Sequence, residues 1–599
     1  MIKNKISWMI GGEAGYGIMA AGTTFAKACS RGGLHVFINS EFPSLIKGGH
    51  NISLVRVDEE EIYSHLETID LLVALNQETV DLHLSEIVPG GGIIYDGEQI
   101  NVTKESLKRK DVVLFSVPLT KIVRELGAEL LLRNTVVVGA SMAILDYDFG
   151  LLEGAIRDSF GKKKGEIVEQ NKKAARMGYD YVKQNICSGN GSVGQECGYK
   201  LEPRKTPERM LLTGNDAIAM GAIKAGCKFY AAYPMTPVSA ILHTMAEKAK
   251  EFNIVVKQTE DEIAAMNMII GAGFAGARAM NATSGGGFSL MVEALGLAAM
   301  TETPIVTVEG QRPGPSTGQP THTAQGDLKF LLSAGQGEFV RIVIAPGDRE
   351  ECFYETFNAF NLAEKFQVPV LILVDKFLAE DYKTTELFDQ SNLKIERGKL
   401  LSQEELNKIS DYKRYLNTED GISPRALPGQ LNGVHCAPST EHDETGFSHE
   451  ASDALMTPEV VKMMLEKRMR KLSSIEKELK PPKLYGPEKA DLTLVSWGST
   501  KGPIFEVMKL LEKDGVKVNF LQILYLSPFP SEEVKKVLSS AKIIVDVENN
   551  YTAQLASLIR EKTGIEIQHR ILKYDGRPFY PNFIYNELYE IQTLRNLRK

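Results

Sequence analysis

Residues 228–242, KFYAAYPMTPVSAIL, have the pattern of a strand that ends in a stiffened loop and continues into a helix. The apolar run from Phe229 stops at Pro234, and Thr236 lies between Pro234 and Pro237. Proline fixes its own φ and disfavours helical geometry in the residue before it. A strand followed by a loop and a helix is the repeating unit of α/β folds, which bind ligands at the carboxyl ends of their strands. The stretch therefore predicts an α/β domain. By itself it favours an ordinary turn over a Thr236 hydroxyl that is presented to a ligand.

Strand-like and helix-like runs alternate along most of the chain, which predicts an α/β protein with three doubly wound domains. A length of 599 residues is more than one hydrophobic core supports. The expected organisation is a first domain over 1–186, a linker over 187–206, a second domain over 207–380, a loop-rich arm over 381–485 and a third domain over 486–599.

Two apolar runs are assigned to strands on their composition. NTVVVGA, residues 134–140, is expected to be a strand of a parallel sheet in the first domain, and MLLTGND, residues 210–216, is expected to open the second domain with a strand.

Composition excludes several classes of protein. The formal net charge of −8 argues against general nucleic-acid binding and against adhesion to an acidic membrane surface. No apolar run reaches the ~18 residues that a membrane helix needs. The six cysteines form no CxxC pair, which indicates a reduced, cytoplasmic protein without an iron–sulfur or zinc motif. The first residues enter a strand at once, so no signal peptide is expected.

Two glycine-containing loops in the first domain are candidate anion sites. GGEAGYG, residues 11–17, follows an expected strand and opens an expected helix, where backbone amides can cradle a phosphate. Its glycine spacing differs from GxGxxG. The loop is therefore explained either by dinucleotide binding or by tight packing of the strand against the helix. Lys47, beside Gly48 and Gly49, suits an anion contact, although an exposed loop lysine is the commoner explanation.

A carboxylate at the start of an apolar helix is the strongest candidate for chemistry. In QTEDEIAAMN, residues 258–267, Glu260 and Asp261 fit helix capping. Glu262 is followed by apolar and small residues and is expected to point inward. A buried carboxylate is costly unless it is paired or hydrogen-bonded, and such groups are often functional.

Downstream, NATSGGGFSLM (281–291) contains three glycines that allow a close approach of backbone to a ligand. In VEGQRPGPSTGQPT (308–321), Arg312 lies in a loop rich in Gly and Pro. Its guanidinium suits a carboxylate substrate, whereas an exposed loop arginine is the ordinary alternative.

Taken together, these motifs resemble the α subunit of the 2-oxoacid:ferredoxin oxidoreductases, preceded by that family's γ subunit as a fused domain. The resemblance spans nearly the whole chain. The motifs that carry it are YPMTPVS, QTEDEIAA, ATSGGGFSLM and QRPGPSTGQPT in the second domain, GGEAGYG and FPSLIKGGHN in the first, and TEDGISPRALPG, EHDETG and VENNYTAQLASLIR downstream. The downstream group resembles the 2-oxoglutarate-type members.

The resemblance implies thiamine diphosphate as cofactor and coenzyme A as co-substrate. Residues 207–380 are then a pyrimidine-binding domain, and residues 486–599 resemble a transketolase C-terminal domain. Glu262 is implied to hydrogen-bond the aminopyrimidine ring and to act as the catalytic residue. Thr236 and Arg312 are implied to bind the substrate carboxylates. The implied cofactor contacts are Tyr233, Pro234, Gly285 and Gly286 as well as Glu262, and Lys47 is a possible contact to coenzyme A.

The chain lacks a GDG motif followed by Asn, which holds the diphosphate through Mg²⁺ in this family, and it lacks a cysteine cluster. A β subunit is therefore expected to bring Mg²⁺, the diphosphate site and a [4Fe-4S] cluster. The implied assembly is αβ or (αβ)2, with ferredoxin as electron acceptor and 2-oxoglutarate as substrate. Pyruvate or a branched-chain 2-oxoacid is the alternative substrate. Two alternative functions of a different kind are a non-catalytic scaffold and a dinucleotide-binding subunit of a reductase.

The segment HCAPSTEHDETGFSH, residues 435–449, contains His435, His442 and His449 at intervals of seven. These residue types suit zinc or iron, but the spacing matches no compact metal motif. An ordered or subunit-contacting loop is the default expectation, and no metal is assigned to this chain.

Overall fold

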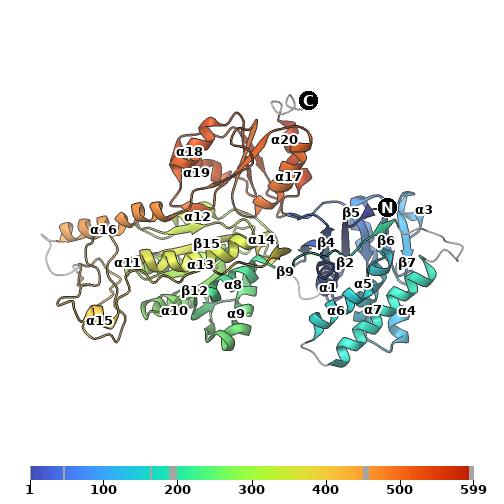
Figure 1. The fold of residues 1–599 in the computed structure, drawn as a ribbon, viewed down its shortest axis with the longest axis horizontal. Helices are drawn as coiled ribbons and strands as arrows, with labels where there is room; N and C mark the ends of the chain where they lie inside the picture. The colour runs from blue at the N-terminus through green and yellow to red at the C-terminus, as the bar shows by residue number, and fades with distance from the viewer. Residues whose placement is uncertain (1, 45–47, 162–164, 188–197, 449–456, 592–599) are drawn as a thin grey trace. The chain divides into compact units, whose positions relative to one another are not determined.

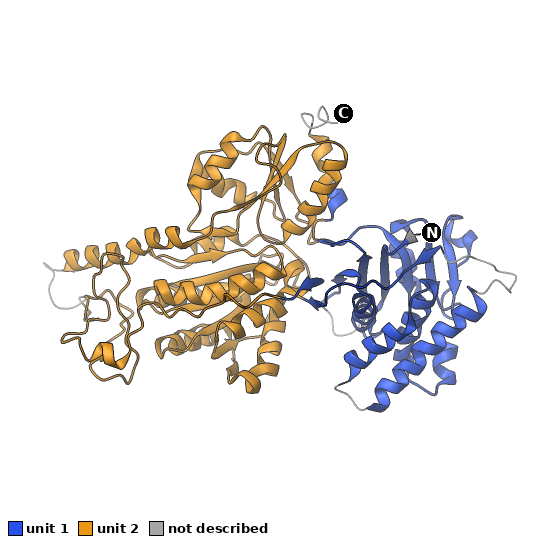
Figure 2. Cartoon of the chain, in the orientation of Figure 1, with its two compact units in different colours: residues 1–212, 381–387, 580–583 blue, residues 213–380, 388–579, 584–599 orange. Residues whose placement is uncertain are grey.

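A computed structural model describes residues 2–44, 48–161, 165–187, 198–448 and 457–591. The chain divides into two compact units (Figure 2). Unit 1 contains residues 1–212, 381–387 and 580–583, and unit 2 contains residues 213–380, 388–579 and 584–599. Both units therefore include segments that are far apart in the sequence.

Unit 1 is built on an eight-stranded sheet with the order β7-β6-β5-β2-β4-β3-β16-β9 (Figure 1). Its strands are β2 (Ile6–Glu13), β3 (His35–Glu41), β4 (His50–Asp58), β5 (Ile69–Ala74), β6 (Ile87–Tyr95), β7 (Val113–Ser116), β9 (Arg209–Leu212) and β16 (Tyr382–Glu386). The strands from β7 to β2 are parallel, whereas β4, β3, β16 and β9 each pair antiparallel with their neighbours. The prediction of a parallel sheet is therefore wrong for the antiparallel half of the sheet, which contains β4, β3, β16 and β9. A separate parallel pair joins β1 (Ile2–Lys3) to β8 (Tyr199–Lys200).

Two strands of this sheet come from outside residues 1–186. β9 contains only residues 210–212 of the run MLLTGND that is expected to open the second domain, because Thr213 caps α8 and Gly214 begins it. β16 lies at the start of the expected arm. Lys383 of β16 pairs with Leu212 of β9, and Tyr382 pairs with Ile38 of β3. An edge strand is selected by the partner available in three dimensions, which local sequence does not record. The expected domain boundaries stay predictions.

Helices cover both faces of this sheet. One face packs against α1, α5, α6 and α7 through a core that includes Trp8, Phe25 and Leu152, and the other packs against α2 and α3. The helices of unit 1 are α1 (Ile18–Arg31), α2 (Gln77–His83), η1 (Leu84–Glu86), α3 (Lys104–Leu107), α4 (Leu119–Glu125), η2 (Leu130–Leu132), α5 (Arg133–Ile144), α6 (Phe149–Phe160) and α7 (Gly165–Asn185). The run NTVVVGA lies in α5, so its assignment to a strand is wrong. Every residue from Asn134 to Ile144 is buried, so the run has no apolar period that separates helix from strand.

Unit 2 contains a seven-stranded sheet with the order β11-β10-β12-β13-β15-β14-β20. Its strands are β10 (Phe229–Ala232), β11 (Val255–Gln258), β12 (Ala279–Ser284), β13 (Ile305–Gln311), β14 (Ile342–Ile344), β15 (Pro369–Asp375) and β20 (Tyr525–Ser527). All neighbours are parallel except β14 and β20. The associated helices are α8 (Gly214–Lys224), α9 (Ser239–Phe252), α10 (Glu262–Phe274), α11 (Gly285–Met300), α12 (Leu328–Ser333), α13 (Arg349–Phe366) and α14 (Lys376–Glu380). Met266, Phe288 and Leu331 pack one face of this sheet against α10, α11 and α12.

A five-stranded sheet in unit 2 has the order β17-β19-β18-β21-β22. Its strands are β17 (Lys483–Tyr485), β18 (Leu492–Ser496), β19 (Val518–Gln522), β21 (Ile544–Glu548) and β22 (His569–Leu572). The helices of this part of the chain are η3 (Gly498–Thr500), α17 (Lys501–Lys513), α18 (Ser531–Ser540), α19 (Gln554–Thr563) and α20 (Pro581–Glu590). Trp497 and Leu555 join the core that includes Phe288. Three helix-covered sheets confirm the predicted α/β fold class.

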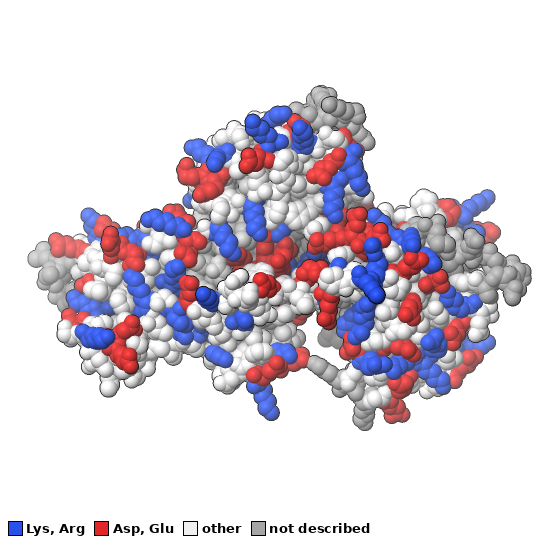
Figure 3. Space-filling model, viewed as in Figure 1, with Lys and Arg blue, Asp and Glu red and all other residues white. Residues whose placement is uncertain are grey.

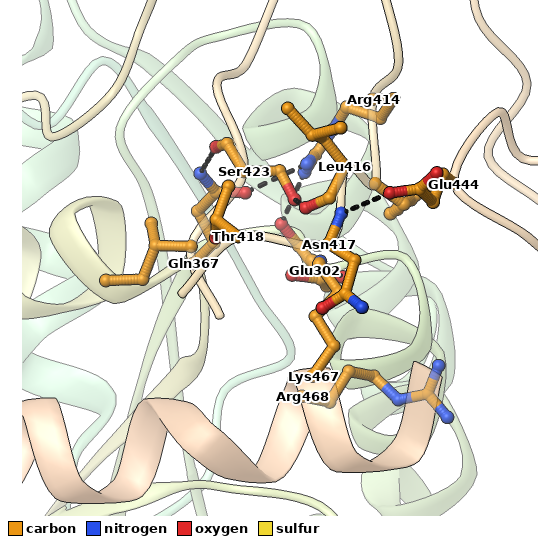
Figure 4. A network of polar contacts seen from close by, with 12 residues as sticks. Glu302, Gln367, Arg414, Leu416, Asn417, Thr418, Ser423, Glu444, Lys467 and Arg468 are labelled. Atoms are coloured by element: carbon orange, nitrogen blue, oxygen red, sulfur yellow. Dashed lines mark hydrogen bonds and ion pairs between the residues drawn. The ribbon is translucent and has the colours of Figure 1, made fainter. Parts of the chain in front are cut away.

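A buried ionic network anchors the loop-rich segment that contains α15 (Gln403–Leu406) and α16 (Thr457–Glu478) (Figure 4). Glu302 has no exposed surface, and its two carboxylate oxygens lie 2.5 Å from Lys467 Nζ and 2.6 Å from Lys471 Nζ, both on α16. Arg414 donates to the backbone carbonyl of Glu302 at 2.8 Å. Burial acts to raise the pKa of Glu302, but the two lysines outweigh it and hold this pKa well below its usual range. Burial lowers the pKa of Lys467 to about 8.

Glu302→Gln is expected to lower the free energy of unfolding of this region by about 3–5 kcal/mol, because it leaves two buried ammonium groups without their counter-charge. Thermal unfolding, together with hydrogen exchange of α16, measures the loss. Glu466→Gln on the same helix is the matched control. It removes an exposed pair with Lys462 at 4.0 Å, and its effect is expected to stay within about 1 kcal/mol. Equal effects of the two substitutions would contradict the anchoring role.

Positive and negative side chains are interspersed over the face of each unit that Figure 3 shows. None of the helices among the described residues is both long and apolar enough to cross a bilayer.

Candidate active site

Apart from Glu262, which begins α10 after β11, and Lys47, the expected site residues follow the carboxyl ends of β10, β12 and β13. These strands are consecutive neighbours in the seven-stranded sheet, and Ser284 at the end of β12 is paired with Gly310 near the end of β13. The loop after β10, the start of α11 and Arg312 therefore meet at one edge of the sheet. This edge is where parallel α/β sheets place ligands.

Glu262 is the first residue of α10, and its side chain is buried, with 4% of its surface exposed. Asp261 caps this helix, since its carboxylate accepts a hydrogen bond from Ala264 N at 2.7 Å, as the capping interpretation predicted. The Oε1 atom of Glu262 has no hydrogen-bond partner among the described residues. An unsatisfied buried carboxylate oxygen is costly, so it indicates a place for a ligand donor.

Gly287 in the first turn of α11 makes room for this carboxylate. A Cβ atom there would lie 2.0 Å from Thr283 Oγ1 and 2.7 Å from Glu262 Oε1. A Cβ at Gly285 would lie 2.5 Å from Asp327 Oδ2, whereas a Cβ at Gly286 would meet no atom closer than 3.8 Å. The packing therefore requires glycine at 285 and 287 and not at 286. Gly287 was not among the expected site residues, although the glycine run that contains it was the signal.

The structure brings Thr236 and Arg312 together. Arg312 donates from Nη1 to the backbone carbonyl of Thr236 at 2.9 Å. The side chain of Thr236 is half-buried, and its hydroxyl makes none of the hydrogen bonds found among the described residues. On the same loop, Met235 Sδ accepts a hydrogen bond from Ser284 Oγ at 2.7 Å, which attaches the loop to the end of β12. The guanidinium of Arg312 therefore contacts the loop that carries the Thr236 hydroxyl.

Tyr233 and Pro234 directly follow β10, with Tyr233 41% exposed and Pro234 half-buried. Nearby, α10 and α11 carry exposed apolar side chains, with Ile263 at 48% and Leu290 at 52% exposure. Large apolar side chains exposed beside a site are typical of a surface that a partner covers.

Two further acidic residues lie at the same strand ends. Glu309 on β13 has no exposed surface, and Asp327 precedes α12. Burial, followed by the neighbouring carboxyl of Asp327, raises the pKa of Glu309 well above its usual range. Burial also raises the pKa of Asp327. The sequence interpretation missed both, although the lone charge in the apolar run PIVTVEG was an available signal.

Lys47, the possible coenzyme A contact, lies outside the described residues. In unit 1 near that loop, His50 Nε2 lies 2.9 Å from His83 Nε2, and His83 Nδ1 lies 2.7 Å from Glu86 Oε2.

The histidine segment shows no metal arrangement in the part of the chain that the structure describes. His435 Nδ1 lies 2.8 Å from the carbonyl oxygen of Gly433. The ring of the buried His442 is tilted against that of Tyr415, with ring centroids 4.1 Å apart, and its Nδ1 lies 2.9 Å from the carbonyl oxygen of Thr440. His449 lies outside the described residues. The default expectation of an ordered loop stays a prediction.

Sequence models of three protein families match different parts of the chain. Residues 220–462 match the thiamine-diphosphate-binding model of pyruvate flavodoxin/ferredoxin oxidoreductases. Residues 7–181 match the model described as pyruvate ferredoxin/flavodoxin oxidoreductase, and residues 490–584 match core domain II of pyruvate:ferredoxin oxidoreductase.

Similar proteins cover the chain almost completely. The 2-oxoacid:ferredoxin oxidoreductase subunit alpha of a Sulfolobus species is 35% identical over 96% of this chain and 95% of its own length. The 2-oxoglutarate synthase subunit KorA of Methanothermobacter thermautotrophicus is 35% identical over 63% of this chain and 98% of its own length. The structure of 2-oxoglutarate:ferredoxin oxidoreductase from Magnetococcus marinus, with 2-oxoglutarate, coenzyme A and succinyl-CoA bound, is 32% identical. It superimposes with a TM-score of 0.88 over 98% of this chain and 99% of that one.

Proposed function

Because the chain belongs to the family of 2-oxoacid:ferredoxin oxidoreductases, whose α subunits it matches over nearly its whole length, we propose that it is the α subunit of a cytoplasmic enzyme that oxidises 2-oxoglutarate. The reaction releases CO2, joins the remaining acyl group to coenzyme A and delivers two electrons to ferredoxin. The electrons pass through an iron–sulfur cluster on a β subunit, in an αβ or (αβ)2 assembly.

The unpartnered Oε1 atom of the buried Glu262 carries this proposal. Thiamine diphosphate is the group that the matching family model names, and the residues present fit it. Glu262 would hold the aminopyrimidine ring and would exchange a proton with it at Oε1, and the glycines at 285–287 would let the backbone lie close to the cofactor. When bound, thiamine diphosphate supplies a carbon nucleophile and an electron sink. Tyr233, Pro234 and Gly286 complete the proposed cofactor contacts.

Thr236 and Arg312 hold the substrate carboxylates in this proposal. The free hydroxyl of Thr236 donates to a carboxylate oxygen, while Arg312 supplies positive charge and a planar pair of donors. The hydrogen bond from Arg312 to the backbone carbonyl of Thr236 fixes the position of the guanidinium relative to the loop that carries Thr236. A substrate that is held in this way is already oriented for reaction, so the entropic cost of orienting it is met on binding.

The relatives support 2-oxoglutarate as the preferred substrate. Two of the similar proteins are named for 2-oxoglutarate, and the solved structure contains 2-oxoglutarate, coenzyme A and succinyl-CoA. Other relatives carry only the general 2-oxoacid name, so pyruvate and branched-chain 2-oxoacids are the alternatives that kinetics must test.

A β subunit completes the enzyme in this proposal. The sequence has six cysteines without a CxxC pair and no GDG motif that grips a diphosphate through Mg²⁺. Mg²⁺ and the [4Fe-4S] cluster therefore belong to the partner. Ile263, which follows Glu262 on α10, and Leu290 on α11 have exposed apolar side chains, and these are the proposed contact surface for this subunit.

The chain purified alone is expected to bind no stoichiometric iron or sulfide and to reduce no viologen with 2-oxoglutarate and coenzyme A. Addition of its β subunit is expected to restore the reduction, since the metal and diphosphate sites then become available. Iron and sulfide analysis, with the viologen assay, measures both results. If the chain purified alone is brown from bound iron and sulfide and is active, the proposal that the β subunit supplies the cluster and the diphosphate site is wrong.

A further inference from the structure

The segment that carries Arg312 is attached at its far end to the five-stranded sheet. Residues 312–327, called here the linking segment, connect β13 to α12. Gln325 lies near the end of this segment and has no exposed surface. Its backbone N–H donates to the carbonyl oxygen of Asn549 at 2.7 Å, and its own carbonyl oxygen accepts a hydrogen bond from Asn550 Nδ2 at 3.1 Å. Both asparagines directly follow β21, so the main chain of Gln325 is bound to the end of that strand.

The side chain of Gln325 has further partners from the same part of the chain. Its Nε2 atom donates to the carbonyl oxygen of Trp497 at 3.0 Å, and its Oε1 atom accepts from Asn549 N at 2.9 Å and from the hydroxyl of Thr500 at 3.1 Å. Trp497 directly follows β18, the strand beside β21. A Cβ atom at Gly498 would lie 2.9 Å from Gln325 Nε2, so glycine leaves room for the amide. A buried amide that is bonded at both its oxygen and its nitrogen has a fixed position.

Two residues further on, the linking segment is bonded to the end of β13. Asp327 N donates to Gln311 Oε1 at 3.0 Å, and Gln311 is the last residue of β13, with 1% of its surface exposed. Arg312 is the next residue, and its Nη1 atom donates to the Thr236 carbonyl oxygen at 2.9 Å. A continuous series of hydrogen bonds and short stretches of main chain therefore leads from the ends of β18 and β21 to the guanidinium.

We propose that Gln325 is a positioning residue for Arg312, through which the five-stranded sheet fixes the guanidinium that binds substrate. This inference rests on the proposed function, in which Arg312 binds a substrate carboxylate. Every residue of the linking segment is described, and none lies in a helix or strand, so the groups that hold its ends determine its path. An arginine that is held in place before the substrate arrives loses little conformational entropy on binding. Loss of the positioning is therefore expected to weaken substrate binding.

Gln325→Met is expected to raise KM for 2-oxoglutarate while kcat changes little. Methionine is close to glutamine in length but lacks the amide that bonds to Trp497, Asn549 and Thr500. The expected rise of KM is about fivefold to tenfold, within the range of coupling energies between residues of one hydrogen-bond network. The kcat at saturating substrate is expected to change less than about twofold, because the substrate orients the guanidinium once it is bound. Steady-state kinetics of the assembled complex, with saturating coenzyme A and a viologen acceptor, measures both constants.

A double-mutant cycle with Arg312→Ala tests whether the effect passes through the guanidinium. If Gln325 acts on substrate binding only through Arg312, Gln325→Met is expected to change KM by less than about twofold in the Arg312→Ala background. A general destabilisation of the fold would instead raise KM by the same factor in both backgrounds, and that result overturns the inference. An unchanged KM in the single variant Gln325→Met overturns it as well.

Gln522→Met is the matched control. Gln522 is also a buried glutamine of the five-stranded sheet, but its Nε2 atom donates to Glu351 on α13 at 2.7 Å and its Oε1 atom accepts from the hydroxyl of Tyr485 at 3.0 Å. The control is expected to lower the thermal unfolding temperature without a change in KM. A rise of KM as large as that of Gln325→Met would show that any disturbance of this sheet has the same effect, and it would contradict the role of Gln325.

Thr500→Val is the second variant, and it keeps the proposal testable if Gln325→Met does not fold. It removes one hydrogen bond to Gln325 Oε1 and retains the shape of the side chain. KM is expected to rise about twofold or more, and only where Arg312 is present.

Arg312→Ala by itself separates this inference from the proposed function. If it leaves KM unchanged, the assignment of Arg312 to the substrate fails. If it raises KM while Gln325→Met and Thr500→Val do not, only the positioning role fails.

Discussion

The complex that carries Glu262→Gln is expected to lose nearly all 2-oxoglutarate-dependent electron transfer while it assembles normally. Glutamine fills the same buried space against Gly287 but cannot exchange a proton at the position of Oε1. Proton transfer by a positioned side chain contributes about 10²- to 10⁴-fold to a rate, and kcat is expected to fall by that factor. Viologen reduction measures the loss, and gel filtration with the β subunit tests assembly.

Glu260→Gln is the matched control for this prediction. Glu260 lies two residues earlier in the same motif, but its side chain is exposed. The control is expected to retain kcat within about twofold, as substitutions at exposed positions usually do little. Near-normal turnover of Glu262→Gln, with loss of turnover in Glu260→Gln, would show that the wrong carboxylate had been assigned.

The second large effect is expected at Arg312, with a smaller one at Thr236. Thr236→Ala removes one hydrogen bond to a charged group, which is worth about 1.5–3 kcal/mol, and should raise KM. Arg312→Ala removes a charge and a bidentate donor and should have the larger effect with 2-oxoglutarate. If Arg312 binds the distal carboxylate, the loss with pyruvate, which lacks that group, is smaller. Steady-state kinetics of the reconstituted complex with both oxoacids measures these differences.

Equal losses for the two oxoacids would instead place Arg312 at the carboxylate that both share, beside Thr236. Arg312→Lys separates charge from geometry, because lysine keeps the charge without the planar donor pair. It also separates substrate binding from the bond that Arg312 donates to the Thr236 carbonyl. Changes in kcat/KM below about tenfold, or ~1.4 kcal/mol, in both alanine variants would show that neither residue binds substrate.

Local sequence predicted the α/β class, because strand and helix periods are properties of consecutive residues. It also predicted the cap of α10, since Asp261 acts on Ala264 only three residues away. It failed at NTVVVGA, where burial on every side removes the apolar period, and at β9 and β16, where the partner strand lies far away in the sequence. Errors therefore fall where pairing or burial, rather than propensity, decides the structure.

The sequence by itself determined which chemical groups the site contains: a carboxylate at the start of a helix in Glu262, a hydroxyl between prolines in Thr236 and a loop guanidinium in Arg312. Only the tertiary structure decided that Glu262 keeps an unpartnered oxygen against Gly287 and that Arg312 reaches the carbonyl of Thr236. The reason is physical. The identity of a group is set by its own residue, whereas its burial, its hydrogen-bond partners and its protonation depend on neighbours that the order of strands in the sheet brings together.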